Sequence, residues 1–149
     1  MNLSASGYFH RLLHASGQSR SARTVELFGW LILLESPLML LGPNIAASII
    51  HLPALNEQAA NYFRIMGLLI GGLGMLYVVS GRLNSEGFVF ASMLDRPLVP
   101  FVMLVLWWQG IIPGPLALAF ALQDGGSFLW TLFTWRAEQS ASKSAETNG

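Results

Sequence analysis

Three charged side chains, Glu35, Arg64 and Asp124, stand inside stretches of sequence that are otherwise apolar. An ionisable group in the apolar part of a membrane costs about 2.5–3.5 kcal/mol on insertion scales, so it usually faces protein or water and finds a partner. At a rise of 1.5 Å per residue, the depths of Glu35 and Arg64 in their helices differ by only about 4–5 Å. This similarity predicts an ion pair between these two residues.

Asp124 precedes a short run of small residues, and Thr131 follows seven positions later on the same helix face. We expect its carboxyl group to find a partner in Tyr77, in nearby hydroxyl groups or in Arg64. The polar core is either a clasp that orients helices or a small cavity that binds a ligand or relays protons. No second carboxylate follows Asp124 at i+3 or i+4, so we assign no catalytic residue. The predicted polar core or ligand site comprises five residues: Glu35, Arg64, Tyr77, Asp124 and Thr131.

Glycine residues recur at helical spacing along the second apolar stretch, so that a helix brings four of them to one face: Gly67, Gly71, Gly74 and Gly81. The first two form a GxxxG unit, which lets membrane helices approach closely. We expect this face to be a helix-packing stripe. The alternatives are a lipid-sized groove beside Tyr77 and a contact between two copies of the chain.

Signals for other chemistry are weak. The sequence has no cysteine, which excludes disulfides, thiolate metal sites and Fe–S clusters. Its histidines, His10, His14 and His51, lack a nearby carboxylate ligand, and no phosphate-binding glycine loop is present, so we expect no metal and no cofactor. Eight Lys and Arg balance eight Asp and Glu. Without an excess of positive charge, we expect no nucleic-acid partner.

The elements that must position these residues are apolar helices. The chain has 149 residues, of which 53% are hydrophobic and 11% charged, and its mean hydropathy of +0.51 favours the lipid bilayer as its solvent. We predict an all-α integral membrane four-helix bundle with short interfacial helices, in a domain spanning residues 23–136. Two of its helices are short of the roughly 20 residues that a crossing needs, and the third could begin near Met93. The expected transmembrane helices cover about residues 25–42, 60–81, 97–112 and 115–135.

The remaining segments are expected at the membrane surface or in water. Residues 1–22 read as a cytoplasmic N-terminal tail that is mobile or forms a short surface helix, and residues 137–149 as a disordered cytoplasmic C-terminal tail. Residues 44–59 and 84–96 mix apolar and polar side chains, which is typical of short interfacial helices.

The distribution of positive charge predicts the orientation. The expected outer loops, residues 43–59 and 113–115, hold no Lys or Arg, so the bacterial inner membrane with both termini cytoplasmic is predicted. Arg82 and Arg96 are expected to contact lipid headgroup phosphates. A cleaved signal peptide is the competing interpretation of the first stretch, and Glu35 within it disfavours cleavage. Seven cations are expected on the side of the termini: Arg11, Arg20, Arg23, Arg82, Arg96, Arg136 and Lys143.

Several short elements carry a resemblance to a known family: Arg64 with Gly67, Tyr77 with Gly81-Arg82, Phe88, the Arg96-Pro97 pair, and Asp124 followed by Trp130-Thr131. Over about residues 25–136 the chain resembles the BphX-like family of small bacterial membrane proteins, which are related in style to DoxX-like proteins. Some of these are encoded beside genes for the degradation of aromatic compounds. The resemblance implies a four-helix topology and brings no established activity.

Two classes of function follow as expectations. The first is a non-enzymatic inner-membrane protein, either an accessory subunit of a membrane protein partner or a binder of a small apolar molecule. The second is an integral-membrane enzyme or a proton-coupled carrier that uses the Asp, Arg, Glu and Tyr residues of the polar core. A homo-oligomer packed through the glycine face, which includes Gly67, Gly71 and Gly74, is a third expectation.

Overall fold

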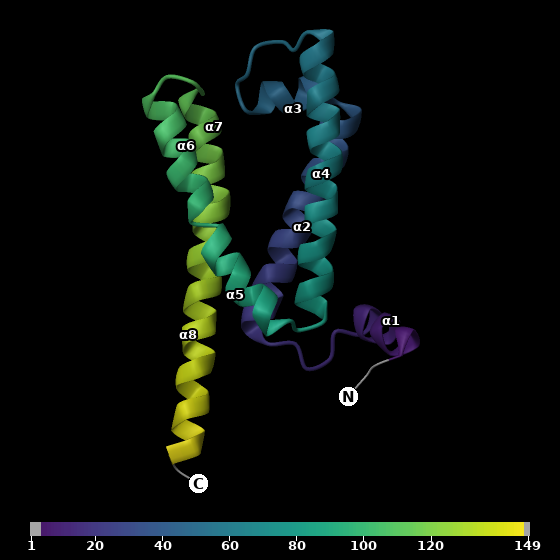
Figure 1. Cartoon of the computed structure of the whole chain (residues 1–149), viewed down its shortest axis with the longest axis vertical. Helices are drawn as coiled ribbons and strands as arrows, with labels where there is room; N and C mark the ends of the chain where they lie inside the picture. The colour runs from purple at the N-terminus through teal and green to yellow at the C-terminus, as the bar shows by residue number, and fades with distance from the viewer. Residues whose placement is uncertain (1–3, 148–149) are drawn as a thin grey trace.

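The structure, a computed structural model, describes residues 4–147, and within this range it contains helices and no strands. The all-α prediction is therefore confirmed. The longest helices, α2, α4 and α8, run along the molecule, and shorter helices lie between and beside them (Figure 1). In chain order they are α1 (Ala5–Leu13), α2 (Arg20–Leu41), α3 (Pro43–Ile49), α4 (Glu57–Arg82), α5 (Glu86–Asp95), α6 (Leu98–Trp108), α7 (Gly114–Phe120), the π-helical segment η1 (Ala121–Gly125) and α8 (Gly126–Thr147).

Four segments are long and apolar enough to cross a membrane: Arg20–Leu41, Glu57–Arg82, Glu86–Trp108 and Gly114–Ala145. The third joins α5 to α6, and the fourth joins α7, η1 and α8. Both ends of the chain lie at one end of the long axis of the molecule, and the α3–α4 and α6–α7 connections lie at the other (Figure 1). The chain therefore runs along the molecule four times, as a four-crossing membrane bundle requires.

The third segment that is long and apolar enough to cross a membrane begins at Glu86, about eleven residues before the start that the sequence predicts for the third crossing. The expected interfacial helix at 84–96 is instead α5, the first half of this crossing. Val89 and Met93 of α5 are buried in the same cluster as residues of α2. Packing against α2, which a local pattern of apolar and polar residues does not reveal, places this segment inside the bundle.

The two tails are more helical than predicted. Helix α8 continues to Thr147, where the sequence predicts a disordered tail from residue 137; residues 148–149 lie outside the described range. Its last turns contain Ala, Glu, Gln and Lys, which favour helix formation. The Glu138 carboxylate also accepts bonds from the Ser21 hydroxyl and from two backbone N–H groups at the start of α2. In the N-terminal tail, α1 is a short helix capped by Ser4, and residues 1–3 lie outside the described range.

Among the helices that the structure describes, α2 and α4 share the most extensive contact, and glycine lines it. A Cβ atom added at Gly74 would lie 2.9 Å from the Leu33 backbone nitrogen, and one added at Gly81 would lie 2.7 Å from that of Glu26. Gly29 of α2 is equally tight, since its Cβ would lie 2.7 Å from Tyr77 Cβ. The glycine face of α4 is thus covered by α2 of the same chain.

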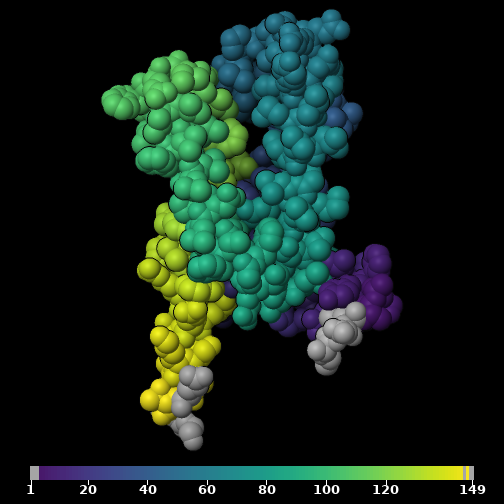
Figure 2. Space-filling model, viewed as in Figure 1, coloured from purple at the N-terminus to yellow at the C-terminus, as the bar shows by residue number. Residues whose placement is uncertain are grey.

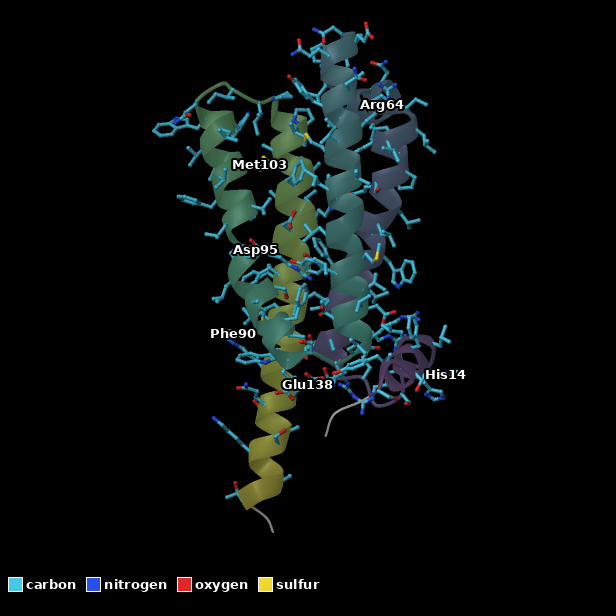
Figure 3. The ribbon with its side chains drawn as sticks, turned by 45° about the vertical axis from the view of Figure 1, so that its right-hand side comes forward. His14, Arg64, Phe90, Asp95, Met103 and Glu138 are labelled. Carbon is cyan, nitrogen blue, oxygen red and sulfur yellow. The ribbon has the colours of Figure 1, made fainter. Side chains whose placement is uncertain are left out.

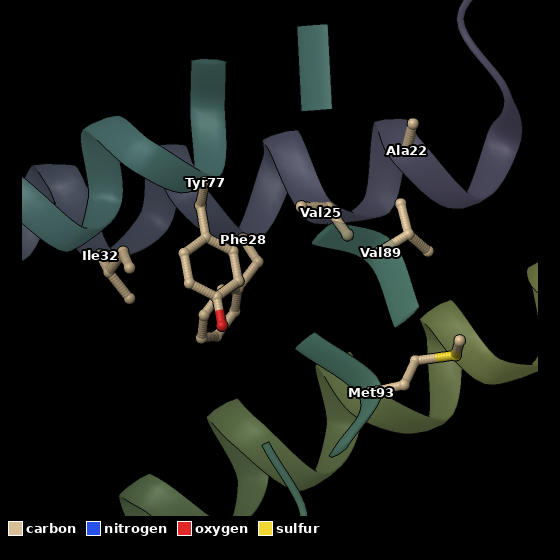
Figure 4. Packing of buried hydrophobic residues seen from close by; sticks show 7 residues of the cluster. All are labelled: Ala22, Val25, Phe28, Ile32, Tyr77, Val89 and Met93. Carbon is tan, nitrogen blue, oxygen red and sulfur yellow. The ribbon is translucent and has the colours of Figure 1, made fainter. Parts of the chain in front are cut away.

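The hydrophobic core lies where α2, α4 and α5 meet, toward the end of the molecule that holds the termini (Figures 1 and 4). The Tyr77 ring packs at 5.2 Å between centroids against Phe28 and at 4.9 Å, edge-on, against Phe88. Partly buried side chains of α8 complete the cluster. Its buried members are Ala22, Val25, Phe28, Ile32, Tyr77, Val89 and Met93.

The opposite end of the molecule is divided into two arms. Within the described chain, α6 contacts α5, α7 and η1, and α7 contacts α6 and η1. Among these described helices, neither α6 nor α7 contacts α2, α3 or α4. The space-filling view shows a hollow between the α6–α7 arm and the arm formed by α3 and α4 (Figure 2). The turn that joins α5 to α6 lies at the level where the two arms diverge (Figure 1).

Candidate functional site

Among the side chains that the structure describes, the most deeply buried charged one is that of Arg96, which is 1% exposed. It occupies the turn between α5 and α6 and is followed by Pro97, whose ring and missing N–H interrupt a helix. Asp95, labelled in Figure 3, shows the level of this turn along the bundle. Because the crossing starts at Glu86, Arg96 lies about 15 Å along it.

This burial corrects the expectation that Arg96 contacts lipid phosphates. A side chain that is 1% exposed is surrounded by protein and does not reach the surface of the bundle. The expectation depended on starting the third crossing at residue 97, whereas the apolar segment of the structure begins at Glu86 and contains Arg96.

Two aromatic rings flank the Arg96 guanidinium. Its Cζ atom lies 4.0 Å from the ring centroid of Phe28 on α2 and 5.0 Å from that of Tyr77 on α4. A desolvated cation over an aromatic face gains about 2 kcal/mol, and Arg is the cation that most often makes this contact. The rings therefore hold the guanidinium plane in a fixed position.

A chain of hydroxyl groups holds one end of the same guanidinium. Arg96 Nη1 donates to Thr131 Oγ1 at 3.2 Å, and this hydroxyl lies 2.8 Å from that of Thr24. Both threonines are buried, Thr131 completely. They connect α8 and α2 through the arginine, which comes from a third crossing.

The other edge of the guanidinium is unsatisfied. Arg96 Nε and Nη2 are buried and make no hydrogen bond of acceptable geometry with residues 4–147, although the Tyr77 hydroxyl lies close enough to act on the guanidinium. Buried polar groups nearly always have a partner, and a charged group without one costs more than about 1–3 kcal/mol. These two nitrogens lie on the same edge of the planar guanidinium and form a two-donor fork, which suits bidentate acceptors.

Asp124 is a buried acidic residue close to Arg96. It is 8% exposed and lies in η1, a π-helical segment; such segments occur frequently at functional sites. Its charge acts on the Arg96 guanidinium. The two side chains nevertheless stay beyond the 4.0 Å of an ion pair, and the one ion pair in the described chain joins Arg82 to Glu26.

We call this group of six residues the Arg96 cluster: Thr24, Phe28, Tyr77, Arg96, Asp124 and Thr131. Every one of them is buried. They come from α2, α4, the α5–α6 turn, η1 and α8, so all four crossings contribute. Such an arrangement can bind an acceptor group at the Arg96 fork, with Asp124 as a charged or proton-carrying neighbour.

The structure brings together three of the five residues predicted for the polar core, namely Tyr77, Asp124 and Thr131. Glu35 lies beside them, since its carboxylate accepts a bond of 3.2 Å from Gln123, the residue before Asp124. Arg64 lies apart from the cluster.

Arg64 is exposed near the end of the molecule opposite the termini (Figure 3). Its Nη1 donates to Asn61 at 2.8 Å on the same helix. The expected ion pair between Glu35 and Arg64 is therefore absent from the described chain. Similar depth is not sufficient for a pair, because helix rotation directs Glu35 toward η1 and Arg64 toward the outside.

Arg82 engages protein groups at the terminal end of the bundle. Its Nε pairs with Glu26 at 2.7 Å, and its Nη1 donates to the Leu12 carbonyl oxygen at 2.6 Å. Glu26 also accepts bonds from Gln18 and Trp30. Contact of Arg82 with lipid phosphates stays a prediction, and its partners in the structure tie α1 to α2 and α4.

Two surface pockets lie away from the Arg96 cluster. One, of about 440 Å³, lies between the starts of α2 and α5 and the last turns of α8. The other, of about 400 Å³, is an apolar groove on the α6–α7 arm. Neither is lined by a residue of the cluster. In the described chain, no group of three or more His, Cys, Asp or Glu residues could hold a metal ion.

Sequence reasoning missed the central residue of the cluster. Arg96 is followed by Pro97 within a run of mostly apolar residues from 86 to 108, and this context was a usable signal. Phe28 and Thr24 carry no signal of their own, because an aromatic residue and a threonine in an apolar helix are ordinary. Their role depends on the crossing that delivers Arg96.

Comparison with known proteins adds no relative. No family model, no curated protein and no solved structure matches the chain. The resemblance to BphX-like proteins thus remains a prediction from the short motifs that carry it.

Proposed function

We propose that the protein is a multi-pass protein of the bacterial inner membrane, with both termini cytoplasmic, that binds a small and largely apolar molecule at the Arg96 cluster. We propose a binding role rather than catalysis. The observation that carries the proposal is the buried fork of Arg96, whose Nε and Nη2 make no hydrogen bond of acceptable geometry with residues 4–147. A bound acceptor group would accept hydrogen bonds from both nitrogens and offset the free-energy cost of their burial.

The irregular helices support a binding role. Arg96 lies at the break between α5 and α6, and Asp124 lies in the π-helical segment of the fourth crossing. In membrane transport proteins, interrupted helices form binding sites within the membrane. Charged residues inside crossings also mark substrate or ion pathways by default.

The distribution of cations supports the proposed orientation. With Arg96 inside the bundle, six cations remain for the side of the termini, and the α3–α4 and α6–α7 connections hold none. Arg64 lies seven residues into α4, about 10 Å from its start. The asymmetry still follows the positive-inside pattern. The six are Arg11, Arg20, Arg23, Arg82, Arg136 and Lys143.

A proton-coupled carrier is the second candidate, and the position of Asp124 favours it. A carboxyl group close to a buried arginine, but beyond ion-pair distance, can exchange a proton as a ligand arrives. This candidate shares the binding site with the first. It differs in requiring the ligand to cross the membrane.

The binding role is tested by identifying small molecules that co-purify with the protein. We expect mass spectrometry of the protein from native membranes to find one small molecule near equimolar amount. It should be lost in Arg96→Met and retained in Arg64→Met, which removes an exposed arginine from α4. Size-exclusion chromatography and circular dichroism would verify that both variants are folded. A wild-type protein without any such molecule, or equal retention in both variants, would contradict the proposal.

A further inference from the structure

We propose that the group bound at the Arg96 fork is the carboxylate of a membrane-dissolved acyl acid, and that Asp124 takes the proton of that acid. This inference rests on the proposed function, because it names the ligand class for the same site. It concerns the head group, the body and the proton of the ligand, and each has its own basis in the structure.

The head group follows from the geometry of the unsatisfied nitrogens. Nε and Nη2 share one edge of Arg96, and a two-donor edge matches the two oxygens of a carboxylate. A hydroxyl or a single carbonyl oxygen would satisfy only one of these donors in a linear bond. Arg96 is also the one cation of the cluster, which suits a head group with a single negative charge rather than a phosphate.

The body of the ligand follows from the division of the molecule into two arms. From the α5–α6 turn to the α6–α7 connection, the α6–α7 arm contacts neither α2, α3 nor α4 within the described chain. Figure 2 shows the hollow between the arms, and its inner end lies at the level of the turn that carries Arg96. Apolar side chains are exposed on both arms, for instance Leu69 and Leu118. An acyl chain between the arms would gain contact with such surfaces.

The transfer of the proton to Asp124 is inferred from the charge balance of the Arg96 cluster. Arginine stays protonated in proteins, so an ionised Asp124 neutralises the cluster before a ligand binds. A second buried anion would leave net negative charge, which is costly inside a membrane. The groups whose charges act on Asp124 are Arg96 and Asp95 from the third crossing and Glu35 from α2. The Tyr77 hydroxyl on α4 is the remaining titratable neighbour.

The exchange is then electroneutral. The O–H bond of the carboxylic acid breaks, an O–H bond forms on the Asp124 carboxylate, and the acyl carboxylate pairs with the Arg96 fork. No charge enters or leaves the cluster. When the ligand arrives as an anion from water, one proton accompanies it from solution.

The head group is tested with three probes of equal chain length: decanoate, decanol and decanamide. Binding to the wild-type protein in lipid nanodiscs would be measured by calorimetry, with empty nanodiscs as the blank. We expect decanoate to bind at least tenfold more tightly than either neutral probe. Arg96→Lys, which keeps the charge and loses the fork, should weaken decanoate binding at least tenfold, and Arg64→Lys should leave it unchanged.

The proton is tested by repeating the titration in buffers with different heats of ionisation. At about pH 7.5 free decanoate is ionised, so we expect uptake of about one proton for each decanoate bound. Asp124→Asn should bind decanoate without proton uptake. If Asp124→Asn does not fold, the number of protons that the wild-type protein takes up for each decanoate bound still tests the inference.

The outcomes separate the head-group inference from the proposed function. Equal binding of decanol and decanoate would overturn the carboxylate inference and leave a binder of apolar molecules. Decanoate binding without proton uptake by the wild-type protein would overturn the role of Asp124. A wild-type protein that binds none of the probes and carries no small molecule from its membranes would overturn both proposals.

Discussion

Replacing Gly74 by alanine should destabilise the protein, because this glycine lies in the close contact between α2 and α4. An added Cβ atom would lie 2.9 Å from the Leu33 backbone nitrogen and 3.0 Å from both Leu33 Cα and the Gly29 carbonyl oxygen. All three are backbone atoms of α2, so no side-chain rotation can relieve the contact. The whole helix must move away.

The magnitude follows from how far α2 must move. Ordinary van der Waals contact of a Cβ atom begins near 3.4 Å, so a contact of 2.9 Å requires a displacement of about 0.5 Å. Overpacking of this kind costs about 1–3 kcal/mol. Gly72 provides the matched control, since it lies two residues away on the same helix and its Cβ would meet nothing within 4 Å. Gly72→Ala should be neutral or stabilising by up to about 1 kcal/mol, because alanine favours the helix.

The assay is unfolding of the purified protein in mixed micelles by increasing mole fractions of dodecyl sulfate, followed by the loss of helical circular dichroism. We expect the free energy of unfolding of Gly74→Ala to fall below that of Gly72→Ala by about 1–3 kcal/mol, because both variants gain the same helix preference and only Gly74→Ala is overpacked. Equal stability of the two variants would refute the close approach of α2 and α4. So would a Gly74→Ala protein that is more stable than the wild type.

Two further predictions concern the cluster and the orientation. Thr131→Val should lower the free energy of unfolding by about 1–3 kcal/mol, because it removes the hydrogen-bond acceptor of the buried Arg96 Nη1. Thr134→Val, which loses bonds only within α8, should stay near the wild type in the same assay, and an equal loss would contradict this account. The chain has no native cysteine, so Ser142→Cys and Ala54→Cys can report orientation through a membrane-impermeant maleimide. We expect labelling of position 54 in spheroplasts and of position 142 only after the membrane is opened, and the reverse pattern would overturn the proposed orientation.

The four crossings could be predicted because lipid imposes strong patterns on sequence. A crossing needs about 20 apolar residues, and close packing of two membrane helices needs small residues at helical spacing. Residues 60–81 satisfy both conditions, and α4 runs from Glu57 to Arg82 with its glycines against α2. The partner glycine on α2, Gly29, stands without a second glycine at helical spacing on that helix, so local sequence does not distinguish it.

The third crossing could not be predicted in full because its first half carries polar residues. Glu86, Asp95 and Arg96 make residues 84–96 similar to an interfacial helix. In the structure, Arg96 Nη1 donates to Thr131 and the guanidinium lies over the ring of Phe28; these partners stand 35 residues later and 68 residues earlier in the chain. Only the tertiary fold shows that a charge at this position has partners inside the bundle.

Charge and backbone irregularity coincide in this molecule. The first two crossings are continuous helices packed through glycine, whereas the third is interrupted after Asp95 and the fourth contains the π-helical segment η1. Each interruption carries one charged residue of the Arg96 cluster, and α6 packs against η1, which brings the two interruptions side by side. A helix-orienting clasp would need neither irregularity, since straight helices satisfy their own backbone groups in lipid. Departures from regular local structure concentrate at functional sites, where other parts of the fold compensate for them. The unsatisfied edge of Arg96 at this position therefore favours a binding site over a packing contact.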